Sequence, residues 1–316
     1  MPSSHFIETA AKVRNWGRWG ADDVLGTLNL IDAAARKRAA AAVIDGDART
    51  LGLPMSAAEG IQLGFIKGRV NPQLTMSRIN EAEDMAPDGP CFTEDVVTFS
   101  MQSATHLDGL AHVSCDGLLY NGYRADEIDE QGSRRLGIHH LGPVVTRGLL
   151  LDLPRARGED LLPAGHAITI EDLEAAVTAG GVRPEPGDAL CIRTGQMAHL
   201  ALGRALDDAA RNLVAYTWPA PGLTIETAAW FHDHDVSLVA TDTMTLEVFP
   251  GENEEDFLPV HVLHLFEMGL TQGQNWVLDD LAEAVASDGR PTFLLDATPL
   301  AFTGAVGGAV NPLALR

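Results

Sequence analysis

The chain has 316 residues, of which 46% are hydrophobic and 21% are charged, as in an ordinary globular protein. Its formal net charge of −22 argues against nucleic acid and against anionic membranes as partners, because both bind clustered lysine and arginine. Three cysteines, Cys91, Cys115 and Cys191, form no CxxC pair and no disulfide framework, which favours a cytoplasmic location. No apolar run approaches the ~20 residues that a membrane span needs.

The first 95 residues predict an N-terminal arm followed by a loop-rich segment. An alanine-rich run at 33–42 predicts a helix that begins at Asp32 and ends near Asp45 and Gly46. Residues 51–95 contain many glycines and prolines, which predicts an extended arm or loop rather than regular structure. The β-branched and aromatic residues of 95–101 then predict a strand.

After residue 145, predicted strands alternate with predicted helices. Apolar runs indicate strands at 148–153, 189–193, 237–241 and 292–296. Helices are expected to begin at Thr169, Thr224 and Pro259 and near Asp279. This alternation predicts an α/β fold, and because no linker interrupts it we expect a single domain over 1–316.

The most informative stretch is Ser103–His112, which contains His106, Asp108 and His112 in the pattern HxDx₃H. If the strand at 95–101 persists to Asp108, His106 and Asp108 point to the same face, because side chains alternate along a strand. Gly109 then permits a turn that returns His112 to that face. Imidazole and carboxylate ligands suit Zn, Mn, Fe or Ni, although a structural histidine paired to an aspartate would produce part of the same pattern.

Other candidate residues allow a functional and a structural interpretation. His261 and His264 lie three positions apart on the helix that begins at Pro259, and for His264 we favour a packing role. Trp276 could stack on an aromatic substrate or belong to the core. Cys115 follows His112 by three residues, and we expect a buried free thiol there.

With these residues placed, the sequence resembles the metal-dependent cyclase family, which includes kynurenine formamidase and isatin hydrolase, and in particular its longer members. The family motif H-x-G-T-H-x-D-x-P-x-H aligns with residues 102–112, QSATHLDGLAH. The resemblance continues through NWGRWG at 15–20, PGD at 186–188, PVH at 259–261 and GAVGG at 304–308. It departs from the motif at Gln102, Ala104 and Leu110, where the family has His, Gly and Pro.

The resemblance implies a swivelling β/β/α fold, a homodimer or homotetramer, and a divalent metal, Mn²⁺ or Zn²⁺. It places His106 and Asp108 as metal ligands and His112 as general base or acid. The family's late ligand, 13 residues after His261, falls on Gln274, and His261 itself is either a ligand or a catalytic group. Because Gln102 and Gln274 replace stronger ligands, we expect one metal ion rather than two.

These expectations together predict a metal-dependent hydrolase. Its reaction would cleave a carbon–nitrogen bond of an aryl formamide, cyclic amide or imide by metal-activated water. Its partner would be a small carbonyl substrate, either aromatic or not. Two alternatives remain: a lactone hydrolase or ring-closing cyclase at the same metal, and a catalytically idle protein that only binds a metal or ligand.

Overall fold

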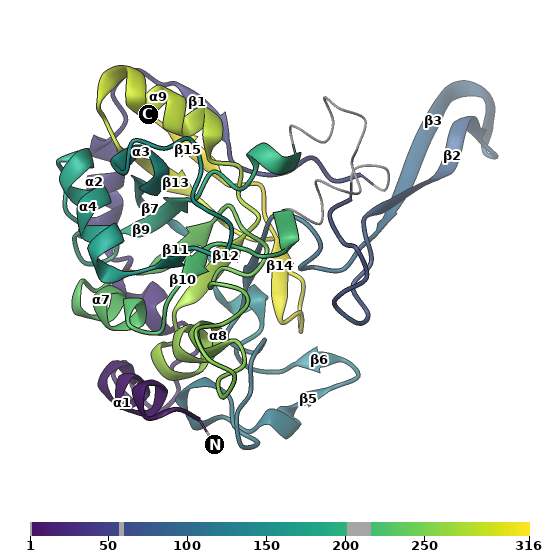
Figure 1. Ribbon diagram of the computed structural model, residues 1–316. Coiled ribbons are helices and arrows are strands. Elements are labelled where there is room, and N and C mark those ends of the chain that lie inside the picture. Colours follow the sequence, from purple (N-terminus) through teal and green to yellow (C-terminus); the bar gives the residue numbers. More distant parts are fainter. Residues whose placement is uncertain (1, 57–59, 201–215) are drawn as a thin grey trace.

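The structure, a computed structural model, describes residues 2–56, 60–200 and 216–316 (Figure 1). In this part of the chain nine strands form one mixed sheet in the order β1-β15-β13-β7-β9-β11-β12-β4-β14. Their bounds are β1 (Ala48–Thr50), β4 (His106–Asp108), β7 (Val145–Asp152), β9 (Ala189–Arg193), β11 (Leu238–Thr241), β12 (Thr271–Gln274), β13 (Thr292–Asp296), β14 (Gly307–Ala309) and β15 (Leu313–Leu315).

Helices cover this sheet, and their bounds are α1 (Ser4–Val13), α2 (Ala33–Ala41), α3 (Leu153–Ala156), α4 (Ile170–Gly180), α7 (Thr227–Asp233), α8 (Pro259–His261) and α9 (Asp279–Asp288). Short 3₁₀ turns are η1 (Gly26–Leu30), η2 (Tyr120–Gly122), η3 (Ala125–Glu127) and η4 (Ile138–His140), and a π-helix, η5 (Val262–Met268), continues α8. Two small strand pairs lie outside the main sheet, β5 (Ile128–Asp129) with β6 (Gly132–Ser133), and β8 (Ala167–Ile168) with β10 (Gly222–Leu223).

The parallel strands β7, β9, β11 and β12 form the centre of the sheet and are buried on both faces. Because side chains alternate, Leu149 and Leu151 of β7 pack in one apolar cluster with residues of α4 and α7. Leu150 points to the other face and packs in a second cluster with residues of η1 and α9. Covering a parallel sheet on both faces confirms the α/β class expected from the sequence.

The helix boundaries follow the capping residues of the sequence. The Asp32 side chain accepts a hydrogen bond from the Ala35 amide at the start of α2, and Thr169 with Asp172 forms a capping box at the start of α4. The helix expected at Thr224 begins at Thr227 instead, because the Thr224 hydroxyl donates to the Ile168 carbonyl oxygen and holds that residue to β8. Within the described residues, no helix combines the length and apolar character that crossing a bilayer requires.

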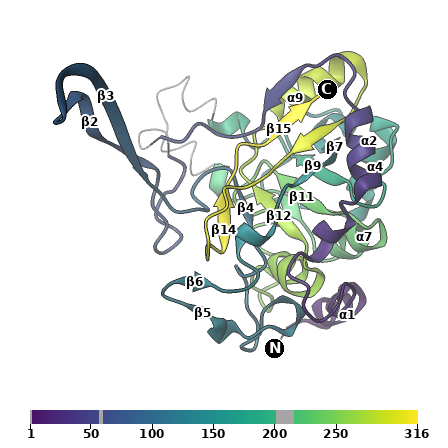
Figure 2. The ribbon, with the colours of Figure 1, turned by 180° about the vertical axis from the view of Figure 1, so that it is seen from behind.

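Residues 73–94, expected as an extended arm or loop, are an arm with regular structure, and the strand expected from residue 95 forms the end of it. Together they form a hairpin of β2 (Gln73–Glu83) and β3 (Ala86–Thr98) that projects away from the main sheet (Figure 2). Prolines and glycines are tolerated because the hairpin is exposed and its pairing is irregular. The strand that includes residues 95–98 does not persist to Asp108: β3 ends at Thr98, a turn follows, and β4 is a separate strand.

A buried ion pair joins neighbouring strands of the sheet. Asp188, which precedes β9 and is fully buried, accepts hydrogen bonds from Arg147 of β7, with Nη2 to Oδ2 at 2.6 Å, and from the Glu185 amide at 2.8 Å. Removing Asp188 would leave the mostly buried Arg147 with the half-exposed Glu185, at 2.9 Å, as its remaining carboxylate partner among the described residues.

We therefore expect Asp188→Ala to lower the free energy of unfolding by about 1–3 kcal/mol, because the buried donors that it accepts from lose their partner while Arg147 keeps Glu185. Urea denaturation monitored by circular dichroism measures this loss. The matched control is Asp126→Ala, which breaks the exposed pair with Arg124 and should cost less than about 1 kcal/mol. Equal effects of the two substitutions would contradict a structural role for the buried pair.

Candidate metal and catalytic site

The site is built on β4, an interior strand of the sheet. His106 and Asp108 project to the same face, while Leu107 between them packs into the apolar core on the other side. The strand lies antiparallel to both β12 and β14, so Gln274 stands opposite His106 and Gln272 opposite Asp108. The shared face predicted from the HxD spacing is confirmed, although the strand is shorter than expected.

A turn after β4 returns His112 to this face, as the sequence predicted. The Gly109 amide donates to the Val306 carbonyl oxygen at 3.0 Å, and the His112 amide donates to the Gly109 carbonyl oxygen at 2.9 Å. A Cβ at Gly109 would lie 2.9 Å from the Val306 oxygen, so this close approach requires glycine. His112 Nε2 then lies 3.7 Å from Asp108 Oδ1, and its side chain is 25% exposed.

His106 and Asp108 present two lone pairs to each other without a proton between them. The His106 Nδ1 lies 2.8 Å from the Ala104 carbonyl oxygen, which places the ring proton on Nδ1 and leaves Nε2 as an acceptor. This Nε2 is 3.5 Å from Asp108 Oδ1, and neither buried atom has a hydrogen-bond partner among the residues that the structure describes. Two buried acceptors facing each other are unfavourable unless a cation lies between them.

The charges of the site agree with this geometry. Burial lowers the pKa of His106 to about 4, so its ring is neutral and free to act as a ligand. Burial alone would raise the pKa of Asp108, but His112, His106 and His261 outweigh it and lower that pKa to about 2. The site therefore holds a carboxylate rather than a carboxylic acid at neutral pH.

His261 reaches the same carboxylate from α8. Its Nδ1 is hydrogen-bonded to the buried Glu247, which also accepts hydrogen bonds from the backbone amides of Val260 and His261 at 2.8 and 3.1 Å. Burial would lower the pKa of His261, but the charge of Glu247 overcomes it and raises that pKa. The His261 Nε2 lies 3.9 Å from Asp108 Oδ2, so the ring is held with this nitrogen toward the site.

Two glutamines of β12 complete the surroundings of Asp108. Gln274 Nε2 donates to Asp108 Oδ2 at 3.1 Å and lies 2.8 Å from His261 Nε2, while Gln272 Nε2 donates to the same oxygen at 3.2 Å. A Gln274 side chain that binds a metal would have to turn its amide, because its nitrogen rather than its oxygen faces Asp108 here. The oxygen and nitrogen of an amide are assigned from such hydrogen bonds.

Two donor atoms of this site have no partner among the described residues and are available to a divalent cation. Among the residues that the structure describes, no three His, Cys, Asp or Glu side chains converge in an arrangement that could hold a metal ion. His106 Nε2 and Asp108 Oδ1, however, are unpaired and adjacent, and a neutral amide from Gln274 is within reach. One carboxylate with neutral nitrogen and oxygen donors matches Zn²⁺ or Mn²⁺.

The structure also adds and removes candidates. Glu247 was missed because its contact with His261 spans 14 residues and no local pattern marks it. Trp276 is fully buried, with its indole nitrogen 3.4 Å from the His106 carbonyl oxygen, so it belongs to the core and does not stack on a substrate. His264 is buried and bonded to Gln272, as the packing interpretation predicted.

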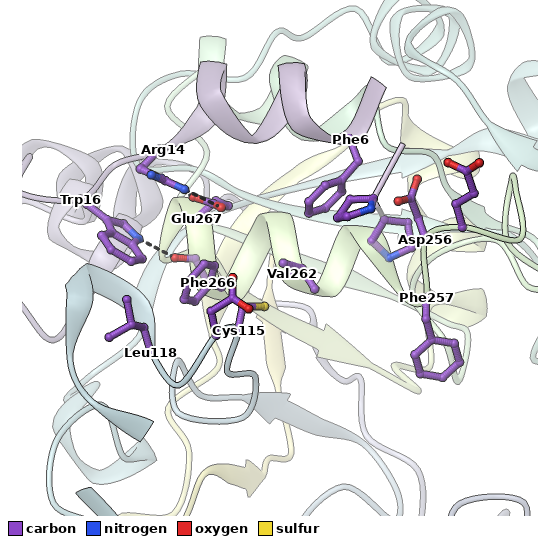
Figure 3. A pocket seen from close by; sticks show the side chains of 14 residues that line it. Phe6, Arg14, Trp16, Cys115, Leu118, Asp256, Phe257, Val262, Phe266 and Glu267 are labelled. Carbon is purple, nitrogen blue, oxygen red and sulfur yellow. Dashed lines mark hydrogen bonds and ion pairs between the residues drawn. The ribbon is translucent and has the colours of Figure 1, made fainter. Parts of the chain in front are cut away.

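A separate cavity of about 550 Å³ lies beside α8 and η5 (Figure 3). Phe6, Trp16 and Phe266 provide apolar walls, and the Arg14–Glu267 ion pair lies within it. Its lining includes none of the residues around Asp108. The cavity is therefore distinct from the candidate site.

Comparisons with known proteins agree on one family. The family model named Cyclase matches residues 57–248. A crystal structure described as a novel cyclase is 32% identical, with a TM-score of 0.84, and the match covers 96% of this chain and 100% of that one. No curated protein sequence matches the chain.

More distant structures share the fold. Isatin hydrolase A from Labrenzia aggregata, bound to benzyl benzoate, is 16% identical with a TM-score of 0.61, over 88% of this chain and 95% of that one. A protein from Bacillus stearothermophilus described as a predicted metal-dependent hydrolase is 14% identical with a TM-score of 0.52, over 86% and 99%. These likenesses confirm the cyclase-type α/β architecture expected from the sequence.

If His106 and Asp108 hold a divalent ion, removing either ligand should abolish stable metal binding. We expect His106→Ala and Asp108→Ala to lose most of about one Mn²⁺ or Zn²⁺ per chain, measured by elemental analysis after dialysis. His166→Ala is the matched control, because His166 also pairs with an aspartate, Asp172, at 2.9 Å, but outside the site. Full occupancy in both site variants would refute the ligand assignment.

Proposed function

The chain belongs to the Cyclase family, and from this premise we propose that it is a metal-dependent hydrolase of carbonyl compounds, acting on a carbon–nitrogen bond of an aryl formamide, cyclic amide or imide. The observation that carries the proposal is the buried pair of unprotonated acceptors, His106 Nε2 and Asp108 Oδ1, 3.5 Å apart. A divalent ion bound there would polarise the substrate carbonyl and make a water molecule more acidic.

In this proposal Asp108, His106 and Gln274 hold the ion and keep its charge partly uncompensated. Asp108 supplies the one negative charge, because His106 is neutral and Gln274 is an amide. Gln272 Nε2, which donates to Asp108 Oδ2, restrains that oxygen and leaves Oδ1 for the ion. In a buried site, hydrogen-bond donors with fixed positions stabilise the negative charge that develops on the substrate oxygen in the transition state.

His112 is the proposed general base and acid. Its ring is partly exposed, whereas His106 is fully buried, so a proton can leave His112 for solvent. Its Nε2 lies 3.7 Å from Asp108 Oδ1, on the side of the carboxylate that also faces His106. From this position it would take a proton from the attacking water and return it to the leaving nitrogen.

His261 would hydrogen-bond the carbonyl oxygen as negative charge develops on it. Glu247 holds Nδ1 of the ring and raises the pKa of His261. In the structure the Gln274 amide nitrogen lies 2.8 Å from His261 Nε2, and once that amide turns its oxygen toward the ion, Nε2 can carry a proton toward the substrate. Because Glu247 holds the His261 ring in one orientation, the hydrogen-bond donor is fixed in place before the reaction begins. Glu247 acts through His261 and is a positioning residue.

An activity screen distinguishes this function from its alternatives. Aryl formamides, cyclic imides and lactones would be tested with Mn²⁺, with Zn²⁺ and after metal removal. Cleavage of the nitrogen compounds alone supports the proposal, and hydrolysis or closure of lactones alone favours the alternative reaction at the same site. Metal binding without turnover of any class would identify a binding protein.

For the active substrate, we expect His112→Ala to retain the metal but to lower kcat by about 10²–10⁴, the contribution of a general acid–base group. The matched control is His232→Ala, because that side chain is similarly exposed, at 26%, but lies at the end of α7. Loss of the metal would make His112 a ligand, and an unchanged kcat would remove it from the mechanism.

We also propose that the protein forms a homodimer through its β2–β3 hairpin. An isolated two-stranded hairpin is marginally stable in water, yet here nearly every residue of both strands is exposed. In the half of the hairpin nearest the main sheet, Leu74 and Val97 pair across the strands and are 63% and 49% exposed. Asp95 is the only charged residue among 73–77 and 95–98. A second copy can cover such an apolar, nearly neutral face in a closed two-fold contact.

If this face is the dimer contact, Leu74→Glu should convert a dimer to monomers because it buries an unpaired charge. Sedimentation velocity reports the mass. Met85→Glu adds the same charge at the hairpin tip, where the side chain is 91% exposed, and should leave the dimer intact. A monomeric wild-type protein, or a dimer that survives Leu74→Glu, would overturn the assignment.

A further inference from the structure

One arginine beside the candidate site has no carboxylate partner. Most described arginines in this acidic protein pair with an aspartate or glutamate, for example Arg14, Arg147 and Arg193. Arg69 is partly buried, but no ion pair joins it to a carboxylate of the described residues. Its one hydrogen bond there is long, from Nη1 to the Gln102 carbonyl oxygen at 3.5 Å.

The base of the hairpin holds Arg69 near Asp108. The Arg69 amide donates to the Ile66 carbonyl oxygen, and the next residue, Val70, is bound to Ser100 at 2.9 Å from its amide to the Ser100 hydroxyl. Gln102, which accepts from the guanidinium, precedes His106 by four residues. The segments before and after the hairpin are therefore bonded to each other, and these bonds hold Arg69 next to the stretch that leads into β4.

The electrostatics of the site agree with this placement. Burial lowers the pKa of Arg69, and the negative charge of Asp108 opposes that effect. The contacts of Gln102 give the same placement. Its carbonyl oxygen accepts from Arg69, its side chain lies against Gly307, and Gly307 stands opposite Asp108 in the register of β14 and β4.

We propose that Arg69 forms an anion subsite next to the candidate metal site and binds the carboxylate of an acidic substrate or product. A partly buried guanidinium with unused donors is suited to paired hydrogen bonds with a carboxylate. Lysine or a neutral donor would not give the same planar contact. Resting on the proposed hydrolase function, the assignment narrows the substrate class to carbonyl compounds that also carry a carboxylate group.

Equilibrium binding tests the subsite without turnover. Benzoate and benzamide have nearly the same shape and differ in charge, so isothermal titration of both into metal-free protein isolates the anion contact from any metal contact. We expect the wild type to prefer benzoate by about 10–100-fold and Arg69→Gln to lose that preference. Arg69→Lys, which keeps the charge without the planar fork, should retain part of it.

Lys67→Gln is the matched control, because it removes an exposed positive charge two residues away and should leave the preference unchanged. Thermal unfolding of each variant confirms that the fold is intact. Equal affinity of the wild type for benzoate and benzamide, or a preference that survives Arg69→Gln, would overturn the subsite. An absence of hydrolysis in the activity screen would refute the proposed function but leave this binding result readable.

Discussion

The buried carboxylate of Asp108 is the constraint around which the site is arranged. A charge in the middle of a sheet is costly unless every neighbour compensates it. One oxygen, Oδ2, accepts from two glutamine amides and faces His261. The other, Oδ1, faces two histidine nitrogens and accepts no hydrogen bond within the described part of the chain. This asymmetry gives the carboxylate one structural side and one side that is available to a cation.

The fold supplies the surrounding groups from separate parts of the chain. Strands β4 and β12 pair side by side in the sheet, and their register places Gln274 opposite His106. The short α8 places His261 near Asp108. The chain then continues as the π-helix η5, a rare form that is often found at functional sites. Glu247, which precedes α8 in the chain, accepts from the Val260 amide and bonds the His261 ring, so a residue outside β4 and β12 fixes the orientation of His261.

The sequence was sufficient where the determining contacts are local. The same-face placement of His106 and Asp108 follows from strand periodicity, and the return of His112 follows from the turn at Gly109. The placement of Gln274 came from family resemblance, and the strand register agrees with it.

The remainder depends on contacts that no local pattern encodes. Glu247 and Arg69 reach the site only through the tertiary fold, one by way of a loop before α8 and the other by way of the hairpin base. The hairpin itself escaped prediction because Pro87, Gly89 and Pro90 normally break strands, and only its exposure lets β3 tolerate them.

Anomalous diffraction from crystals equilibrated with Mn²⁺ tests the central claim most directly. The account predicts one strong peak about 2.0–2.2 Å from both His106 Nε2 and Asp108 Oδ1, with the Gln274 amide turned to present its oxygen. A peak bonded to other residues, or no peak between these two atoms at saturating Mn²⁺, would contradict it.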